Sequence, residues 1–272
     1  MLRRTSKVKR TIGFLVITAV LLLSTLSAGA MQMATLNTQH IDSGILSVQY
    51  SVPQNKVTKI MLENGGERKF YNLPADRSEE SFALNLGDGQ YKVSILEHIS
   101  GNQYRPVSTE TLRVSLKDPT VIYLSSVQEI RWHNEMTAIQ KAAELTEGLT
   151  TDDEKTVAIY EYVVSNISYD YDKFATISSS YLPDIDDTFV SGQGICYDYS
   201  SLFAAMMRSV GVPARMVKGY APGVSEYHAW NEVLIDGEWK TLDTTMDAAY
   251  HQAGHKIEMF KNGAAFSVSS TV

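Results

Sequence analysis

The chain has 272 residues, a formal net charge of −7, 44% hydrophobic residues and 20% charged residues. This composition excludes a disordered chain, and the length allows one large domain or two of ordinary size. The only cysteine is Cys196, which excludes an intramolecular disulfide. The fold must therefore be stabilised by its apolar core.

Residues 1–30 have the three parts of a secretory signal peptide. Five basic residues and no acidic residue lie within residues 1–10, an apolar run follows from Ile12 to Leu26, and the small residues Ala28 and Ala30 come next. The run is shorter than the ~20 residues that span a membrane, so we expect cleavage before Met31. This predicts a secreted or extracytoplasmic protein, held at a membrane only if the segment stays uncleaved.

Removal of residues 1–30 changes the formal charge from −7 to −12, because the five lost charges are all positive. An acidic protein repels polyanions, so we expect no nucleic-acid partner. Peptide and protein partners, including cell-wall peptides if the source is bacterial, fit both the charge and the predicted location.

Residues 31–120 are predicted to form a small antiparallel β-sandwich domain. Short runs of alternating apolar and polar residues are separated by turn sequences, namely Asn64-Gly65-Gly66, Gly87-Asp88-Gly89 and Ser100-Gly101-Asn102. Strands at this spacing are typical of a sandwich. The segment contains no group of residues that points to a reaction.

Residues 121–272 are predicted to form a second, mixed α+β domain. An extended link, "KDPTVIYLSSVQEIRW", leads to two helical patterns, "TAIQKAAELTEGL" and "TTDDEKTVAIYEYVVSNI", and Thr151 with Glu154 fits a capping box at the start of the second. Residues 171–192 are polar and are expected to form a long solvated loop that includes Asp184, Asp186 and Asp187. This loop leads to Cys196.

Cys196 lies at the predicted start of a helix. The apolar residues after it recur at helical spacing (Tyr199, Leu202, Phe203, Met206, Met207 and Val210), and Gly211 with Pro213 ends the pattern. A helix N-terminus favours the thiolate form of a cysteine. The alternative is a buried structural thiol, which behaves as a small apolar side chain.

The sequence "YHAWNEVLIDGEWKTLDTT" predicts a β-hairpin with a two-residue turn at Asp236-Gly237. That turn pairs Ile235 with Glu238. Continuing the register places His228 and Asp243 on the same face, diagonally across the two strands. A carboxylate in this position can hold one imidazole nitrogen and leave the other free for a thiol. We therefore expect Cys196, His228 and Asp243 to form a catalytic triad of nucleophile, base and orienting acid.

Three stretches carry a resemblance to a known family: "GQGICYDYSSLFAAMMRSVGVPARMVKGY", "HAWNEVLIDGEWKTLDTT" and a helix that ends in "NISYD". Over roughly residues 135–250 the chain resembles the transglutaminase-like superfamily. The resemblance implies a papain-like α+β core and acyl transfer through a thioester on peptide or glutamine-type amides, by hydrolysis or by amine cross-linking. The family also includes catalytically dead scaffolds.

Further residues near the predicted triad have two interpretations each. Gln193 is a candidate to bind an oxyanion, or it is a solvated loop residue. Tyr197, with Tyr199, Tyr220 and Tyr227, either lines a substrate groove or packs on the sheet. Trp230 and Trp239 either cover the triad and contact substrate or pack the core.

No cofactor or metal is expected. His251 and His255 have the i, i+4 spacing of a zinc pair, but Gln252 replaces the glutamate of the zinc-peptidase motif and no third ligand is evident. Two functions thus remain: an exported cysteine hydrolase or transglutaminase, and a non-catalytic binding or scaffold protein of the same fold. A metal-dependent enzyme that uses the two histidines is a third and weaker alternative.

Overall fold

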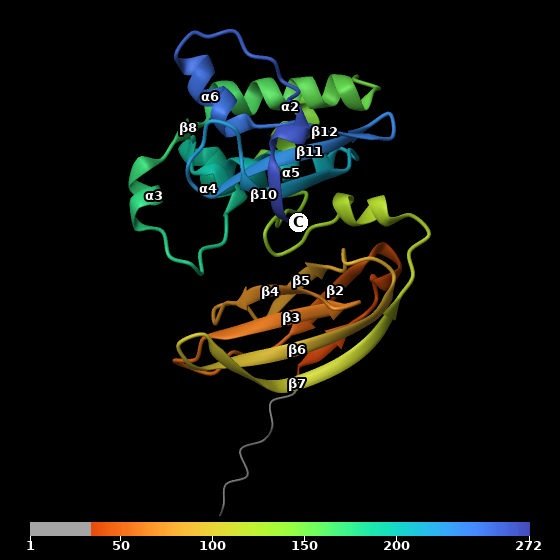
Figure 1. Cartoon of the computed structure of the whole chain (residues 1–272). Helices are drawn as coiled ribbons and strands as arrows, with labels where there is room; N and C mark the ends of the chain where they lie inside the picture. Colours follow the sequence, from red (N-terminus) through yellow and green to blue (C-terminus); the bar gives the residue numbers. More distant parts are fainter. Residues whose placement is uncertain (1–33) are drawn as a thin grey trace, which may run out of the picture. The chain divides into compact units, whose positions relative to one another are not determined.

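The structure is a computed structural model that describes residues 34–272, and the predicted signal peptide lies outside the described residues. The first half of the described chain consists of two antiparallel sheets (Figure 1). One has the strand order β1-β2-β5, with β1 at Thr35–Asn37, β2 at Ile45–Gln49 and β5 at Glu79–Ala83. The other has the order β4-β3-β6-β7, with β3 at Thr58–Asn64, β4 at Glu67–Leu73, β6 at Gly89–Ser100 and β7 at Gln103–Val114.

These two sheets share one apolar core. Alternate residues of β3 are buried, including Ile60 and Leu62, and they belong to the same cluster as Leu46 of β2 and Phe82 of β5. Two sheets that face each other in this way form a β-sandwich, as the alternating sequence pattern predicts. The β3–β4 hairpin turns at two glycines with positive φ, 59° and 91°, which matches the predicted Asn-Gly-Gly turn.

The second half combines helices with a four-stranded antiparallel sheet of order β12-β11-β10-β13. Its strands are β10 (Ala214–Tyr220), β11 (His228–Ile235), β12 (Glu238–Leu242) and β13 (Ser267–Thr271). Its helices are α1 (Thr137–Leu145), α2 (Asp152–Asn166), α3 (Tyr171–Thr176), α4 (Ile185–Ser191), α5 (Cys196–Ser209) and α6 (Thr244–Gln252). The short strands β8 (Ser168–Tyr169) and β9 (Gln193–Gly194) pair in parallel.

The predicted long loop over residues 171–192 is wrong, because α3 and α4 lie within it. Each helix begins at an aspartate whose side chain accepts a backbone N–H bond: Asp170 caps α3 and Asp184 caps α4. Asp186 is also engaged, since its carboxylate accepts from the first two N–H groups of α1, at 3.0 and 2.9 Å. Capping of helix ends therefore accounts for acidic residues that the sequence pattern assigned to a solvated loop.

The predicted extended link is also partly wrong, because Pro119–Leu124 forms a 3₁₀ helix, η2, capped by Asp118. Two other short 3₁₀ turns lie at Ile41–Ser43 and Gly263–Ala265. The predicted capping box of Thr151 and Glu154 is present at the start of α2.

Helix α5 is buried on nearly all sides, which is more than its amphipathic pattern predicts. Every residue from Cys196 to Arg208 except Tyr197 is buried. The helix packs on β10 and β11 on one side and contacts α1, α2, α4 and α6 on others (Figure 1). Arg208 is 3% exposed, and its guanidinium donates to the carbonyl groups of Ala214, Ser125 and Val272. A buried guanidinium needs such acceptors to offset its lost hydration.

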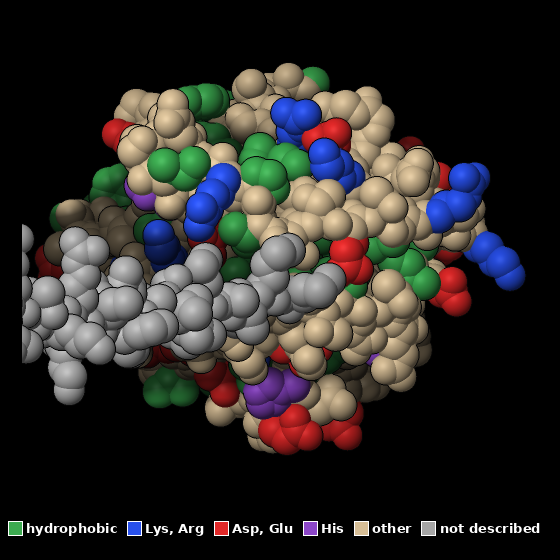
Figure 2. Space-filling model, turned by 90° about the horizontal axis from the view of Figure 1, so that it is seen from below, with side chains coloured by type: hydrophobic (Ala, Val, Ile, Leu, Met, Phe, Trp, Pro, Cys, Tyr) green, Lys and Arg blue, Asp and Glu red, His purple; other side chains and the backbone are tan. Residues whose placement is uncertain are grey.

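The fold class is α+β, with the described residues in one compact unit. Within residues 34–272, no helix is both long enough and apolar enough to span a membrane. On the face drawn in Figure 2, acidic and basic side chains are interspersed with residues of other types.

Candidate active site

Cys196 is the first residue of α5 and is 9% exposed. The first N–H groups of a helix have no partner within the helix, so they provide positive partial charge beside the thiol. The N–H of the preceding residue, Ile195, is already bound to the carboxylate of Asp198 at 2.9 Å. This bond fixes the turn by which the chain enters the helix.

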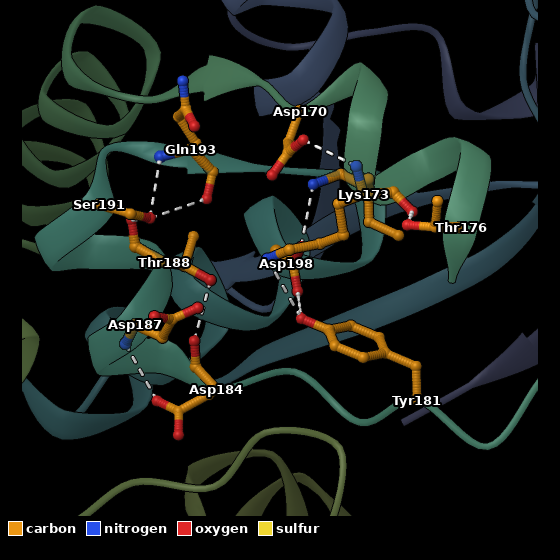
Figure 3. A network of polar contacts seen from close by, with 11 residues as sticks. Asp170, Lys173, Thr176, Tyr181, Asp184, Asp187, Thr188, Ser191, Gln193 and Asp198 are labelled. Atoms are coloured by element: carbon orange, nitrogen blue, oxygen red, sulfur yellow. Dashed lines mark hydrogen bonds and ion pairs between the residues drawn. The ribbon is translucent and has the colours of Figure 1, made fainter. Parts of the chain in front are cut away.

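Asp198 is the centre of a polar network that joins α5 to α3 and to the loop after it (Figure 3). Its Oδ2 also accepts from the Lys173 ammonium at 3.2 Å, and its Oδ1 accepts from the Tyr181 hydroxyl at 2.6 Å. The Asp198 side chain is fully buried, so these donors compensate for the lost hydration of its charge. The network ties the helix that carries Cys196 to the segment 171–181.

The histidine and aspartate are brought together by the β11–β12 hairpin. Its turn is Asp236-Gly237, with φ values of 52° and 79°, and the paired residues run from Ile235–Glu238 to Asn231–Leu242. This is the predicted register. His228 Nε2 lies 2.9 Å from Asp243 Oδ2, and the two residues are 5% and 2% exposed.

Asp243 has a second structural function, because it is the N-cap of α6. Its Oδ1 accepts the backbone N–H of Met246 at 3.1 Å while Oδ2 faces the histidine. Each oxygen of this buried carboxylate thus has its own donor. The arrangement fixes the orientation of the carboxylate, and through it that of the imidazole.

The environment of His228 favours its charged form. Burial lowers the pKa of this imidazole, but the hydrogen bonds and charges of Asp243 and Cys196 raise it by more, to about 10. Since Nε2 faces Asp243, the other ring nitrogen, Nδ1, is the one available to the thiol. A protonated imidazole between a carboxylate and a sulfur atom stabilises a thiolate.

Cys196 and His228 open into a cavity of about 340 Å³. Four aromatic side chains line it, namely Tyr169 on β8, Tyr171 and Phe174 on α3, and Tyr227 just before β11. A larger cavity of about 650 Å³ is lined by Asp243, but neither Cys196 nor His228 lines it. The smaller cavity is therefore the candidate substrate site.

The two tryptophans of the hairpin differ in position. Trp230 is fully buried, stacks on His228 at 6.5 Å between ring centroids, and contacts Phe266 at 5.0 Å. Trp239 instead contacts Tyr123 and lies 4.2 Å from the guanidinium carbon of Arg215. Neither tryptophan lines the cavity of Cys196, so the suggestion that Trp239 covers the triad is not supported by its position.

Gln193 and Tyr197 lie close to Cys196 in sequence, but neither lines its cavity. Gln193 is exposed on β9, and Figure 3 shows its side chain directed away from Asp198. The Tyr197 hydroxyl donates to Glu129 at 2.6 Å, and the Lys218 ammonium lies 4.0 Å from the centre of its ring. The Tyr197 ring is thus held in a separate polar cluster.

The other tyrosines are divided between core and surface. Tyr199 is fully buried and donates to the carbonyl of Ile167, whereas Tyr220 and Tyr227 are half exposed and pack edge to face at 5.8 Å. Of these three, Tyr227 alone reaches the cavity.

The suggested zinc pair is not on one helix. α6 ends at Gln252, so His251 lies in its last turn and His255 lies beyond it. Among residues 34–272, no group of three His, Cys, Asp or Glu side chains has the arrangement of a metal site.

Two sets of residues at the site were not predicted from the sequence. The first set is Asp198 with its partners Lys173 and Tyr181. The second set consists of the wall residues Tyr171, Phe174 and Glu226. An acidic residue at the third position of a helix is a recognised capping signal, so Asp198 was detectable. No periodic pattern identifies exposed aromatic residues as a wall.

The arrangement found here, a cysteine at a helix start facing a buried histidine–aspartate pair on an antiparallel hairpin, is the one used by cysteine-dependent acyl-transfer enzymes. Sequence comparison gives the same result. Residues 139–244 match the profile of the transglutaminase-like superfamily, so this segment of the chain is similar to that superfamily. The predicted resemblance and the predicted α+β class are both confirmed.

Individual proteins and solved structures that resemble the chain have low sequence identity to it. The human kyphoscoliosis peptidase is 29% identical over 118 residues, which is 38% of this chain and 17% of that protein. A solved structure from Cytophaga hutchinsonii, provisionally named a cysteine protease, is 17% identical, with a TM-score of 0.45 over 84% of this chain and 80% of its own. LapG from Legionella pneumophila is 15% identical, with a TM-score of 0.32 over 50% of this chain and 84% of its own.

Proposed function

We propose that the protein is a cysteine-dependent acyl-transfer enzyme that acts on peptide or glutamine-type amides, with Cys196 as nucleophile, His228 as acid and base, and Asp243 as the residue that positions His228. The observation that carries this proposal is the pairing of His228 with Asp243 at 2.9 Å beside Cys196, with Cys196 and His228 lining one cavity. The match of residues 139–244 to the transglutaminase-like superfamily supports it.

In the first half of the reaction, the thiolate of Cys196 attacks the carbonyl carbon of the amide and a carbon–sulfur bond forms. The oxygen of the tetrahedral intermediate is stabilised by N–H groups at the start of α5. His228, protonated at Nδ1, gives that proton to the leaving nitrogen. The carbon–nitrogen bond breaks, and the product is a thioester on Cys196 plus a free amine or ammonia.

In the second half, His228 takes a proton from water or from a primary amine, which attacks the thioester carbonyl. The carbon–sulfur bond breaks and Cys196 leaves as the thiolate. Water yields a carboxylic acid, and an amine yields a new amide. We favour hydrolysis, because aromatic side chains of the cavity wall such as Tyr171 and Tyr227 are half exposed or more, so water reaches the site.

The predicted signal peptide suggests that this reaction takes place outside the cytoplasm, on surface proteins, peptides or cell-wall peptides. The acidic mature chain fits such substrates better than polyanions. These assignments of location and substrate are part of the proposal.

The first test is the reactivity of Cys196. As Cys196 is the only cysteine, iodoacetamide reports on it alone, with Cys196→Ser as the blank. We expect alkylation at pH 7 to be about tenfold slower in His228→Ala, because a free thiol is only a few per cent ionised at that pH. An equal alkylation rate in the two proteins would contradict the proposed pairing.

The second test is turnover. The mature protein is incubated with a glutamine-rich protein and a fluorescent primary amine while ammonia and new peptide termini are measured. Ammonia with incorporated amine identifies a cross-linker, and ammonia or new termini alone identify a hydrolase. A function that survives Cys196→Ala would instead identify the non-catalytic binding protein, and inhibition by chelators rather than iodoacetamide would identify the metal-dependent alternative.

A further inference from the structure

The wall of the cavity beside Cys196 contains large side chains that the fold leaves uncovered. Tyr171 is 75% exposed, Tyr227 51% and Phe174 44%. The ring of Tyr169 connects two of them, with centroids 4.9 Å from Tyr171 and 6.1 Å from Phe174. Exposed aromatic residues grouped around one opening are more typical of a binding site than of scattered surface residues.

Apart from His228, the charged side chain in this wall is acidic, and among the described residues no other basic side chain accompanies it. Glu226 is exposed in the loop before β11 and lines the cavity, and it is the only carboxylate among the lining residues. Within the described part of the chain, no lysine or arginine lines this cavity. Burial first, and then interactions with neighbours that include Cys196, Tyr171 and Glu226, raise the pKa of Tyr169.

The one basic residue of α3 does not oppose this charge. The Lys173 ammonium is turned to the buried carboxylate of Asp198, at 3.2 Å, and lies over the ring of Tyr181 (Figure 3). The same contacts hold α3 in place, and with it Tyr171 and Phe174. The wall is therefore fixed to the helix of the nucleophile, and its own cation is already paired.

From this combination we infer that the cavity binds a cationic side chain, the ammonium of lysine or the guanidinium of arginine, next to the reacting amide. Aromatic faces attract cations through their quadrupole, and a carboxylate at the same opening adds a direct charge interaction. This inference rests on the proposed function for the identity of the reaction, but the binding it describes is measurable without catalysis.

Two sources supply such a cation. It is either a basic residue of the peptide that acylates Cys196, or the amine that accepts the acyl group. In the second case the bound ammonium first gives one proton to water, the neutral amine then gives a second proton to His228 as its nitrogen attacks the thioester, and Cys196 leaves as the thiolate. In both cases the cation interacts with the carboxylate of Glu226, and the experiments below distinguish the two sources.

Binding is tested first with the mature Cys196→Ala protein, which cannot react. Nα-acetyl-lysine methylamide, whose side-chain ammonium is free, and Nα-acetyl-norleucine methylamide are titrated by NMR. The two compounds differ mainly in charge. We expect the lysine compound to bind about fivefold more tightly, and Glu226→Gln to remove most of that difference. Glu238→Gln, an exposed charge change on the hairpin turn outside the cavity, is the matched control and should retain it.

The source is tested with the reactive protein. Peptidyl chloromethyl ketones that carry lysine, norleucine or glutamate beside the reactive group are compared by their rates of labelling at Cys196. A preference for lysine that falls about fivefold in Glu226→Gln identifies a basic residue of the acylating peptide. If Glu226→Gln leaves the labelling preference among the ketones unchanged but raises the half-saturating concentration of propylamine in the incorporation assay, the cation is the acceptor amine.

In the NMR titration, equal binding of the lysine and norleucine compounds, or a binding preference for lysine that Glu226→Gln leaves intact, would overturn the inference. Failure of the proposed function has a different signature, in which the norleucine ketone does not label Cys196. The NMR titration still decides the inference about the cavity in that case. Tyr171→Leu adds a second test, because loss of an exposed ring should weaken lysine binding severalfold without unfolding the protein.

Discussion

Gly194 lies directly against Asp198, and a Cβ atom added to the glycine would come within 2.7 Å of the Cβ of the aspartate. It would also lie 3.1 Å from a methyl group of Thr188. The glycine two residues before Cys196 is thus required by the close approach of the chain to the capping aspartate. Its φ angle is not in the left-handed region, so conformational freedom is not the reason.

We expect Gly194→Ala to lower the free energy of unfolding by about 1–3 kcal/mol, the usual effect of forcing an atom into a packed site. Displacement of Asp198 should also slow alkylation of Cys196. Urea denaturation and iodoacetamide labelling measure the two effects. Gln193→Ala, at the exposed neighbouring position, is the control and should change stability by less than about 0.5 kcal/mol. Equal stability of Gly194→Ala and the wild type would contradict the packing seen here.

Asp243 allows its two functions to be separated by two substitutions. Asparagine still caps α6, so Asp243→Asn should keep the fold but lose several orders of magnitude of turnover, because the imidazole is no longer held in its working form. Asp243→Ala should lose the same turnover and also about 1 kcal/mol of stability from the missing cap. The measurements are calorimetry and the ammonia assay. Wild-type turnover in Asp243→Asn would mean that the carboxylate does not position His228.

The raised pKa of His228, about 10, predicts how amide turnover depends on pH in the alkaline range. Below that pH the imidazole keeps the proton that the leaving nitrogen needs, and above it the proton is lost. Amide turnover should therefore fall as the pH rises through about 10. Alkylation of Cys196 needs no proton donor, so its rate should not fall over the same range. A decrease in turnover near pH 6.5, the ordinary value for histidine, would show that the pairing with Asp243 and Cys196 is weak.

The network around Asp198 predicts graded effects on stability. Tyr181→Phe removes one hydrogen bond to a buried carboxylate and should cost about 1.5–3 kcal/mol, the range for bonds to charged groups. It should also loosen the segment 171–181, which limited proteolysis detects. Tyr220→Phe is the control, since this half-exposed hydroxyl lies outside the network. Equal proteolysis of the two variants would show that Asp198 does not hold this segment.

The relation between His228 and Asp243 was predictable from the sequence because a two-residue turn fixes the register of a hairpin. Asp236 and Gly237 adopt the positive φ values that such a turn requires, and every pair along the two strands follows from them. The start of α5 was predictable for a similar reason, because the apolar spacing after Cys196 is strictly helical. Both inferences depend on local rules of geometry.

The helices α3 and α4 were missed because short helices at the surface bury few residues and so leave little apolar periodicity. Their only signals are the caps Asp170 and Asp184, each followed three residues later by the N–H that it accepts. Asp186 caps a helix 48 residues earlier in the chain, a contact that no local rule predicts. Strand β13 was also missed, because its residues are mainly small and polar and it forms by pairing with β10.

Helix α5 is buried on nearly all sides, whereas the wall of the cavity is exposed, so substitutions in these two parts have different consequences. Amide protons in such a helix exchange with deuterium only when much of the protein opens, so Cys196 is attached to a helix that we expect to exchange slowly. The wall of the cavity, carried by α3 and the loop at Glu226, is exposed and contributes little to the core. Relatives of this protein can therefore acquire new substrate preferences through substitutions in the wall while the helix that carries the nucleophile stays unchanged.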